Sequence, residues 1–378
     1  MTAADPIYLD YNATAPTRPE VIALVGEILA TVGNASSVHQ AGRKARARID
    51  TARQQVADLV GAQAGNVIFT GGGTEADNLA LRGFGPRRLI VSGIEHGAIL
   101  APALLLDPGA VVVGVDNQGR LDLAALEAAL AESDRPALVS LMLANNETGV
   151  IQPVAEAAKI AHAHDALMHC DAIQGAGKIP IDMEALGVDL LSLSAHKIGG
   201  LQGVGALILR EDRMVLAQMV GGGQEMGRRS GTENVAGIAA FGEAARLAAN
   251  ELKQFAELAK LRDNMEARLA EIAPARKVIG GGAARVPNTS CVTMPGVRSD
   301  TQVMALDLSG IAVSAGSACS SGKVAASHVL DAMGMELDEA MTAIRISLGR
   351  DTTPAEIERF LTAWAEIYRR NSAHANAA

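Results

Sequence analysis

Short runs of apolar and β-branched residues recur through the first two thirds of the chain, and longer amphipathic or alanine-rich segments separate them. The runs are apolar at nearly every position, which is typical of strands covered on both faces. Segments such as Asp122–Ala131 and Val154–His164 have the composition and spacing of helices. Strand and helix therefore alternate, which predicts an α/β fold with a mainly parallel sheet flanked by helices. Seven strands are expected, at Val67–Thr70, Leu89–Gly93, Val111–Val115, Ala137–Leu143, Leu167–Asp171, Asp189–Leu193 and Val204–Leu209.

The last two of these strands are joined by a glycine-rich loop, which predicts an antiparallel strand at one edge of the sheet. The segment Val235–Ile272 is rich in good helix formers and predicts a long helical stretch that leads out of the large domain. A shorter α+β pattern follows and ends in a helix, with Thr353 as its expected N-cap and Pro354 as its first residue. We expect a large domain of residues 15–257 and a smaller α+β domain of residues 1–14 and 258–378, with strands at Ser290–Met294, Ile311–Ser314 and Ala343–Ser347.

Length and composition are those of an ordinary globular protein. The chain has 378 residues, of which 49% are hydrophobic and 20% charged, and this excludes a mostly disordered chain. The net charge of -9 argues against a broad surface for nucleic acid or for an anionic membrane. No apolar run reaches the ~18 residues of a membrane span, and Met1–Pro6 lacks the features of a signal peptide. The three cysteines are too widely spaced for a disulfide framework or a CxxC zinc site, so we expect a cytoplasmic protein.

Unusual polar groups follow five of the predicted strands. Ligands of open α/β sheets bind outside the carboxyl ends of the strands. In a parallel sheet these five groups would meet at one edge, and that convergence is stronger evidence than any one of them. They are Gly71–Glu75, Glu95-His96, Asn145–Glu147, Asp171 with Gln174, and Ser194–Lys197.

Three of these groups together describe one cofactor. The turn Gly71–Gly73 before a helix offers backbone N–H groups to an anion, although such turns are more often structural. Lys197 suits a Schiff-base lysine, the alternative being a surface lysine at the end of a strand. Asp171 could hold the pyridinium nitrogen of pyridoxal phosphate, or it could anchor a loop. Each feature is weak alone, but a phosphate site, a reactive amine and a carboxylate are jointly hard to obtain by accident.

Other residues carry candidate chemistry with open alternatives. His96 could stack on a planar ring and transfer protons, or it could be an ordinary turn histidine. Cys319 lies among small residues and is a candidate nucleophile, whereas Cys170 and Cys291 lie in apolar strands and are expected to be inert. Arg345 alternates with apolar positions and suits a carboxylate, or a structural ion pair. We reject a metal site at His162, His164 and His169, because the first two do not share a helix face and no carboxylate pattern supports it.

At this point the chain closely resembles the cysteine desulfurases of the NifS/IscS type, in the class V group of the pyridoxal-phosphate aminotransferase superfamily. The resemblance covers nearly the whole chain and implies a fold-type I pyridoxal-phosphate-dependent transferase with L-cysteine as its substrate. The motifs that carry it are Tyr8–Thr14, Gly33–His39, Thr70–Asn78, Glu95-His96, Asn145–Gly149, Asp171–Gln174, Ser194–Lys197, Arg229–Asn234, Gly316–Cys319 and Arg345–Gly349.

By this resemblance, Lys197 forms the Schiff base with pyridoxal 5'-phosphate, and His96 stacks over the cofactor and moves protons. Arg345 would bind the carboxylate of L-cysteine. Cys319 would attack the substrate sulfur and become a persulfide, while L-alanine leaves. The other implied contacts are Asp171 with the pyridinium nitrogen, Gln174 with the ring hydroxyl, Asn146 beside the cofactor, Gly73, Thr74, Ser194 and His196 with the phosphate, and Thr232 with the phosphate of the other subunit of a homodimer.

The Gly-Ser-Ala-Cys form on a mobile loop, about residues 314–328, resembles the branch that feeds scaffolds for iron–sulfur cluster assembly. The acceptor stays open between a cluster scaffold, a tRNA-thiolation relay and several partners. Two other functions also stay open: another enzyme of this fold, such as an aminotransferase or selenocysteine lyase, and a non-catalytic sulfur-relay or regulatory protein. A dinucleotide-binding oxidoreductase is excluded, because no G-x-G-x-x-G with a downstream carboxylate is visible.

Overall fold

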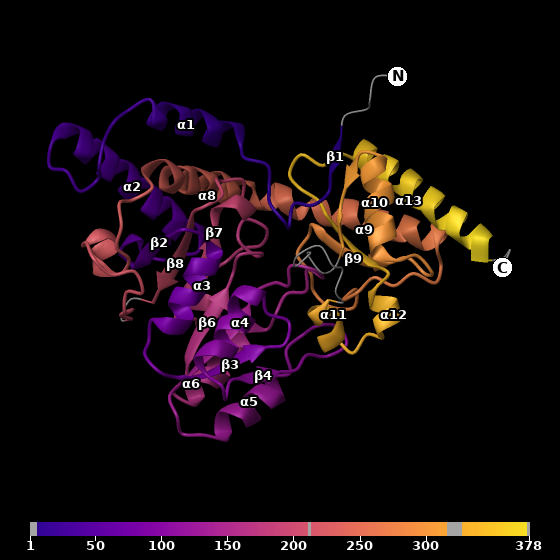
Figure 1. The fold of residues 1–378 in the computed structure, drawn as a ribbon, viewed down its shortest axis with the longest axis horizontal. Helices are drawn as coiled ribbons and strands as arrows, with labels where there is room; N and C mark the ends of the chain where they lie inside the picture. The colour runs from indigo at the N-terminus through magenta and orange to yellow at the C-terminus, as the bar shows by residue number, and fades with distance from the viewer. Residues whose placement is uncertain (1–5, 211–212, 316–326, 376–378) are drawn as a thin grey trace.

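The structure is a computed structural model that describes residues 6–210, 213–315 and 327–375 (Figure 1). Its central element is a seven-stranded sheet in the order β2-β8-β7-β6-β5-β3-β4. Each strand lies where the hydrophobic pattern predicts it, with small shifts at the ends. The bounds are β2 (Val67–Thr70), β3 (Arg88–Ser92), β4 (Val111–Val113), β5 (Ala137–Met142), β6 (Leu167–Asp171), β7 (Leu190–Ser194) and β8 (Gly205–Leu209).

One strand of this sheet runs against the others. β8 is antiparallel to both of its neighbours, β2 and β7, and the other pairs are parallel. An antiparallel strand is therefore confirmed, but its predicted place at the edge is wrong, because β2 forms that edge. The connection from β7 to β8 holds only a short 3-10 turn, so the chain must return beside β7. β2 remains parallel to β7, and its carboxyl end lies on the same side as those of β3, β5 and β6.

Helices cover both faces of the large sheet. On one face, α2 and α8 pack together and share an apolar core with α5 and α6, and α3 and α4 cover the other face. Side chains of β6 alternate between the two: Met168 and Cys170 belong to the first core and Leu167 to the second. His169 and Asp171 therefore point toward α3 and α4. The helices are α1 (Pro19–Leu29), α2 (Gln40–Leu59), α3 (Gly73–Arg82), α4 (Gly97–Leu106), α5 (Leu123–Ala131), α6 (Val154–Ala163), α7 (Met183–Leu186) and α8 (Val235–Ala256).

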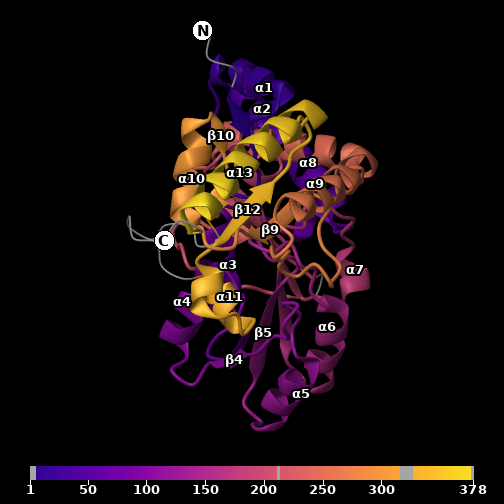
Figure 2. The same ribbon diagram turned by 90° about the vertical axis from the view of Figure 1, so that its right-hand side faces the viewer.

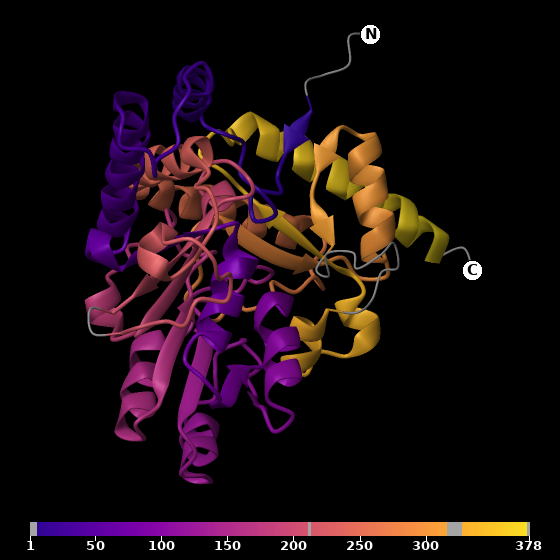
Figure 3. The same cartoon turned by 60° about the vertical axis from the view of Figure 1, so that its left-hand side comes forward.

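A second apolar core lies in the C-terminal part and includes the N-terminal strand. β1 (Ile7–Tyr8) pairs in parallel with β10 (Ile311–Ala312), and Ile7 and Leu9 pack with the buried Trp364 and Phe360. Figure 2 shows the strands β9 and β12 among α9, α10 and α13, and Figure 3 shows the indigo N-terminal helices and the yellow C-terminal helix on opposite sides of the molecule. The elements are β9 (Thr289–Thr293), β11 (Ser314–Ala315), β12 (Ala343–Ser347), α9 (Leu258–Ile272), α10 (Ser299–Leu308), α11 (His328–Ala332), α12 (Leu337–Ala340) and α13 (Pro354–Ala375).

The helical stretch predicted over Val235–Ile272 is confirmed, and the structure divides it into two helices. Two helices, α8 and α9, meet at Glu257, where the bonds from Glu257 N to Gln254 O and from Lys260 N to Glu257 O have the tighter 3-10 spacing. The physical reason is a change of core, because the buried residues of α8 pack on the large sheet and those of α9 pack with the second core. Helix propensity alone carries no information about which core a residue joins.

The start of α13 follows the sequence prediction. Thr353 Oγ1 accepts the N–H of Glu356 at 3.3 Å, and Glu356 Oε2 accepts the N–H of Thr353 at 2.6 Å, a reciprocal capping box.

Across the parts of the chain that the structure describes, no helix combines the length and apolar character needed to cross a membrane.

The second core gives a stability prediction. Trp364→Ala removes a fully buried indole ring and should lower the free energy of unfolding by about 3–5 kcal/mol, measured by circular dichroism in denaturant. The control is Leu308→Ala on α10, whose side chain is 83% exposed and should change stability by less than about 0.5 kcal/mol. Equal effects of the two substitutions would contradict the assignment of this core.

Candidate active site

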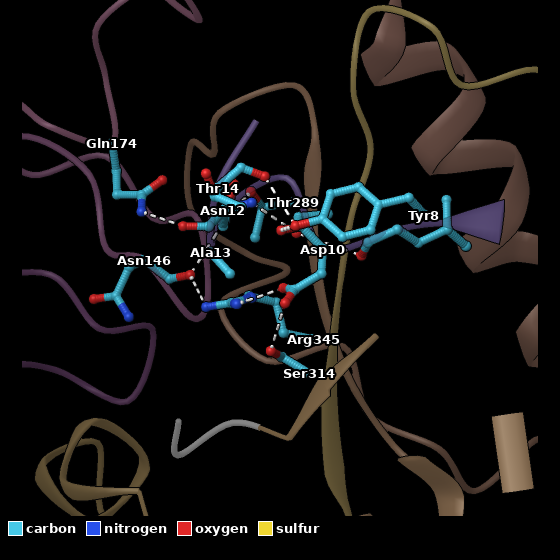
Figure 4. A network of polar contacts seen from close by, with 12 residues as sticks. Tyr8, Asp10, Asn12, Ala13, Thr14, Asn146, Gln174, Thr289, Ser314 and Arg345 are labelled. Carbon is cyan, nitrogen blue, oxygen red and sulfur yellow. Dashed lines mark hydrogen bonds and ion pairs between the residues drawn. The ribbon is translucent and has the colours of Figure 1, made fainter. Parts of the chain in front are cut away.

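The polar groups predicted to converge do meet at the carboxyl edge of the large sheet, and the segment after β1 crosses them. Lys197 lies in the 3-10 turn η2 (Ala195–Lys197) after β7, and Asp171 ends β6. Asn12, which is 1% exposed, makes contacts to both sides of the molecule. Figure 4 shows this network, in which Gln174 and Asn146 lie to the left of Asn12, Tyr8 lies to the right, and Arg345 lies below and reaches both Asn146 and Asp10.

Asn12 uses every polar group that it has. Its backbone oxygen accepts from Lys197 Nζ at 2.6 Å and from Gln174 Nε2 at 2.9 Å. Its backbone N–H donates to Ser347 Oγ at 3.0 Å, and its side-chain Nδ2 donates to Thr289 Oγ1 at 2.9 Å. Lys197 and Gln174 follow strands of the large sheet, whereas Ser347 and Thr289 belong to the three-stranded sheet of β9, β12 and β11. One side chain and its backbone therefore fix the two sheets relative to each other at the site.

Lys197 is an amine with a perturbed pKa. Its Nζ donates to the backbone oxygens of Asn12 and Ala13 at 2.6 and 2.9 Å. Burial lowers the pKa of Lys197 to about 8, the positive charge of Arg345 adds to this effect, and Asp171 and Asp10 oppose it. Near neutral pH a usable fraction of the amine is therefore uncharged and nucleophilic, as a Schiff-base lysine requires.

Asp171 is a buried carboxyl group on the same edge. Desolvation raises the pKa of Asp171 to about 6, while the N–H of Ile173 and the charge of Lys197 oppose the rise. One carboxylate oxygen accepts the Ile173 N–H at 2.9 Å, so this residue does anchor its loop. Since the second oxygen is not used in that bond, the same carboxylate can also meet a cationic ring nitrogen.

The glycine turn forms an open cradle beside Lys197. Gly72 has φ 151°, and it precedes α3 without any side-chain cap, so the first N–H groups of this ten-residue helix face the pocket above the turn. A Cβ at Gly73 would collide with Ile173 and lie 3.3 Å from Ser194 Cβ. The pocket, about 610 Å³, is lined by Gly71, Gly72, Gly73, Thr74, Glu75, Asn78, Ser194, His196, Gln202 and Gly203.

Two histidines at the site are held neutral. Burial and the charge of Lys197 lower the pKa of His196 to about 4, and its Nδ1 lies 3.1 Å from Thr14 Oγ1, which leaves Nε2 for a ligand. Desolvation, and then the charges of Lys197 and His328, lower the pKa of His96 below its usual value. His96 Nδ1 accepts the N–H of Ala98 at 3.1 Å as the N-cap of α4. A neutral ring that accepts at Nδ1 carries its proton on Nε2, which is free to exchange it.

Arg345 makes an ion pair inside the protein. It is 4% exposed, and it donates to Asp10 Oδ1 at 2.7 Å and to the backbone oxygen of Asn146 at 3.0 Å. Arg345 therefore forms a structural ion pair, which was the alternative to a carboxylate-binding role. The buried Arg345 Nε has no hydrogen-bond partner among the described residues. Asp10 also accepts from Ser314 Oγ at 3.1 Å.

The remaining predicted residues are placed less completely. Asn146 is half-buried at the site, and its backbone oxygen accepts from Asn12 and Arg345. Thr232 is exposed and lines, with Gly71, a pocket of about 170 Å³ behind the glycine turn. Its contact with a partner subunit stays a prediction. Cys319 lies outside the described residues.

Histidines away from the site have ordinary partners. His162 Nε2 lies 2.9 Å from Asp189 Oδ2, and His169 lies between the hydroxyls of Ser140 and Ser192 at 2.8 and 2.9 Å. Within residues 6–210, 213–315 and 327–375, no cluster of three or more His, Cys, Asp and Glu side chains could hold a metal ion.

Three positioning residues were missed from the sequence. Asn12 and Asp10 lie in the quoted motif Tyr8–Thr14, but nothing in their spacing showed that this segment crosses the sheet edge. Lys178 is 4% exposed and donates to Asn12 and Gln174. A signal for it was present, because a lysine among the small and apolar residues Ala176-Gly177 and Ile179 is unusual in a core segment.

The donor set fits pyridoxal phosphate. An amine with a lowered pKa, a carboxylate on the neighbouring strand and an uncapped glycine turn with free N–H groups occur on one sheet edge. These are the groups that hold the aldehyde carbon, the ring nitrogen and the phosphate of that cofactor.

Comparisons with known proteins by family model, by sequence and by structure all point to the same family. The model of the family described as aminotransferase class-V matches residues 7–360. A cysteine desulfurase of Cereibacter sphaeroides is 44% identical over 366 residues, which cover 94% of each chain. An IscS-like cysteine desulfurase of Mycobacterium tuberculosis is 41% identical over 369 residues, also 94% of each chain. The X-ray structure of a NifS-like protein from Rickettsia africae has a TM-score of 0.91 at 39% identity, over 96% of this chain and 99% of its own.

The perturbed amine can be tested directly. Acylation of Lys197 in the cofactor-free protein, followed by peptide mass spectrometry from pH 6 to 11, should show a midpoint near 8, because only the uncharged amine reacts. The fully exposed lysine of a model peptide provides the comparison, with a midpoint near ~10.4. Coincident midpoints for Lys197 and the peptide would contradict the assigned environment.

Proposed function

The chain belongs to the aminotransferase class-V family and is a pyridoxal-phosphate-dependent cysteine desulfurase, and on that premise we propose how its own residues divide the work. Lys197 holds the cofactor through its Nζ, Asp171 pairs with the ring nitrogen, and Gln174 donates to the ring hydroxyl. When bound, pyridoxal phosphate withdraws electrons from the bonds of an amino acid attached to its aldehyde carbon. The proposal rests above all on the lowered pKa of the Lys197 amine at the carboxyl edge of the sheet, beside Asp171.

The phosphate is held by the cradle of Gly73, Thr74, Ser194 and His196. The free N–H groups at the start of α3 supply donors and a positive helix end. His196 remains neutral, as its pKa of about 4 requires, so it contributes a hydrogen bond instead of a charge. Asn146 contributes its side chain beside the ring.

His96 moves protons at the open side of the site. Its lowered pKa keeps the ring neutral, and the proton on Nε2 can be delivered to a nearby carbon or sulfur. Because the ring is fixed as the N-cap of α4 through Nδ1, only Nε2 is available for this exchange. In a protein with only 2% aromatic residues, His96 would also be the side chain that stacks on the cofactor ring.

Arg345 binds the carboxylate of L-cysteine. In the absence of substrate, the carboxylate of Asp10 takes its place as the partner of the guanidinium. Support comes from the unpaired Nε, which leaves a buried N–H that a carboxylate could satisfy. Asp10 keeps the guanidinium compensated in the absence of substrate, because a buried charge without a partner is costly.

Cys319 accepts the sulfur. Cys170 and Cys291 are excluded, because both are fully buried and burial raises the pKa of each thiol well above its usual value. The Cys319 thiolate attacks the substrate sulfur, so an S–S bond forms as the Cβ–S bond breaks. The electron pair of the broken bond stays with the substrate carbon, which takes up a proton, and the products are L-alanine and a persulfide on Cys319.

Described residues on each side of the Cys319 segment are bonded to the site. Ser314 donates to Asp10 at 3.1 Å, and Ser327 donates to Glu147 Oε2 at 2.6 Å while it caps α11. Both anchors lie near Arg345, the proposed substrate ligand. These contacts support transfer from the substrate to Cys319.

We propose further that the persulfide passes its sulfur to an iron–sulfur scaffold or another acceptor protein, and that the protein is a cytoplasmic homodimer. The exposed apolar side chains of Leu29, Val32, Met219 and Val220 support an interface between copies. Free thiols at Cys170 and Cys291, and a chemistry that needs a thiolate, support a reducing compartment. We also propose that residues 15–257 form one domain and residues 1–14 with 258–378 the other.

The proposed function is tested by alanine production from L-cysteine by the purified protein with a thiol reductant present. Lys197→Ala should abolish both the visible absorbance of bound cofactor and alanine production, because the substitution removes the amine that would form the Schiff base, and the nearby amine of Lys178 is already bonded to Asn12 and Gln174. The control Lys260→Ala, on a side chain that is 79% exposed, should keep both. A bound-cofactor band in Lys197→Ala would remove Lys197 from its role.

A second prediction separates desulfuration from transamination. Cys319→Ser should still bind L-cysteine, seen as a change in the cofactor spectrum, but it should make alanine at least about 100-fold more slowly, because a hydroxyl cannot take up the sulfur. Near-normal alanine production by this variant would remove Cys319 from the transfer of sulfur, whereas conversion of L-cysteine to a sulfur-containing 2-oxo acid, without alanine, would favour the aminotransferase alternative.

A further inference from the structure

Lys178 is a buried lysine without a carboxylate. It is 4% exposed, and its Nζ donates to Gln174 Oε1 and to Asn12 Oδ1, both at 2.7 Å. No ion pair of Lys178 with an acidic residue occurs in the part of the chain that the structure describes. Lysine is almost never buried this way, because removing an ammonium from water is costly. We therefore expect that the two hydrogen bonds of Lys178 serve a purpose that offsets the cost of burying its ammonium group.

The charges around Lys178 make its position more costly still. Lys197 and Arg345 are the charged groups that act on it, and both are cationic. Burial, followed by these two charges, lowers the pKa of Lys178 well below its usual value. Simple ion-pair stabilisation does not account for a lysine placed here, which directs attention to the two amides that it contacts.

The contacts of Gln174 fix the orientation of its amide. Lys178 Nζ donates to the amide oxygen, Gln174 Oε1, at 2.7 Å. A backbone oxygen can only accept, so the atom 2.9 Å from Asn12 O must be the amide nitrogen. With the oxygen engaged by Lys178 and one N–H by Asn12, the second N–H of Gln174 is the group left for a ligand.

We propose that Lys178 is a positioning residue: it holds the Gln174 amide so that an N–H, and not the oxygen, is presented to the ring oxygen of the cofactor. This inference rests on the proposed function, which assigns Gln174 to that ring oxygen. The same lysine holds Asn12 Oδ1, which also accepts from Asn288 Nδ2 at 3.2 Å. It therefore supports the backbone oxygen that receives both Lys197 and Gln174.

The consequence appears in the absorbance of the bound cofactor, without substrate. A donated N–H stabilises negative charge on the ring oxygen. Without it the oxygen holds the proton shared with the Schiff-base nitrogen more tightly, and the pKa of that nitrogen rises. Lys178→Met should therefore raise the pH midpoint of the visible absorbance change by about one unit. Lys178→Arg, which keeps the donors, should restore the midpoint toward that of the unmodified protein.

A double-mutant cycle separates positioning from charge. Removing the Lys178 charge alone would raise the midpoint equally with or without the Gln174 amide. Positioning instead predicts that Gln174→Ala raises the midpoint and that Lys178→Met adds no further shift in that background. Equal shifts in the two backgrounds, or no shift in either, would overturn the proposal. If Lys178→Met does not fold, Lys178→Gln takes its place in the same cycle.

Borohydride reduction of each protein, followed by peptide mapping, reports whether the cofactor is attached to Lys197. Attachment at Lys197 with equal midpoints in all variants overturns the role of Lys178 and leaves the proposed function intact. The absence of attachment at Lys197 in the unmodified protein overturns the proposed function and this inference with it.

Discussion

The site depends on the hydrogen bonds that one asparagine makes between two separate cores. Asn12 lies in a segment that is anchored at one end by β1, which belongs to the second core, and it reaches the carboxyl edge of the large sheet. Its backbone oxygen receives the reactive amine, and its side chain receives Lys178 and contacts Thr289. Since a buried amide that loses a partner costs about 1–3 kcal/mol, this junction holds the two sheets in one arrangement.

The electrostatics of the site follow from that junction. Lys197, Lys178 and Arg345 are three cationic groups in one small buried region, and the pKa values of the two lysines are lowered. Asp10 pairs with Arg345, and Asp171 supplies the second negative charge. Burial pushes the pKa of the Lys197 amine down and that of the Asp171 carboxyl up, so both groups titrate closer to neutrality than they do in water. Groups shifted toward each other in this way are typical of acid–base and covalent catalysis.

The hydrophobic pattern predicted most of the fold because every strand of the large sheet except β4 is buried at each position, and because the covering helices α2, α3, α6 and α8 are amphipathic. It predicted the convergence of Lys197, Asp171 and His96, because parallel strands bring their carboxyl ends to one edge. The hydrophobic pattern did not predict the features of the fold that depend on contacts between distant parts of the chain. The break at Glu257 depends on which core each helix joins, and the inner position of β8 depends on β2 adding beyond it. Asn12 and Asp10 were quoted as parts of a motif, but their partners lie hundreds of residues away along the chain.

The central claim is that sulfur leaves the substrate and becomes covalently attached to this chain at Cys319. The most direct test is to mix the cofactor-loaded protein with one equivalent of L-cysteine, omit the reductant, stop the reaction and map the peptides by mass spectrometry. The account predicts one additional sulfur atom on the peptide that contains Cys319, in step with alanine formation, and none on the peptides of Cys170 and Cys291. Alanine formed with no sulfur gained by the protein, or sulfur on either buried cysteine, would contradict it.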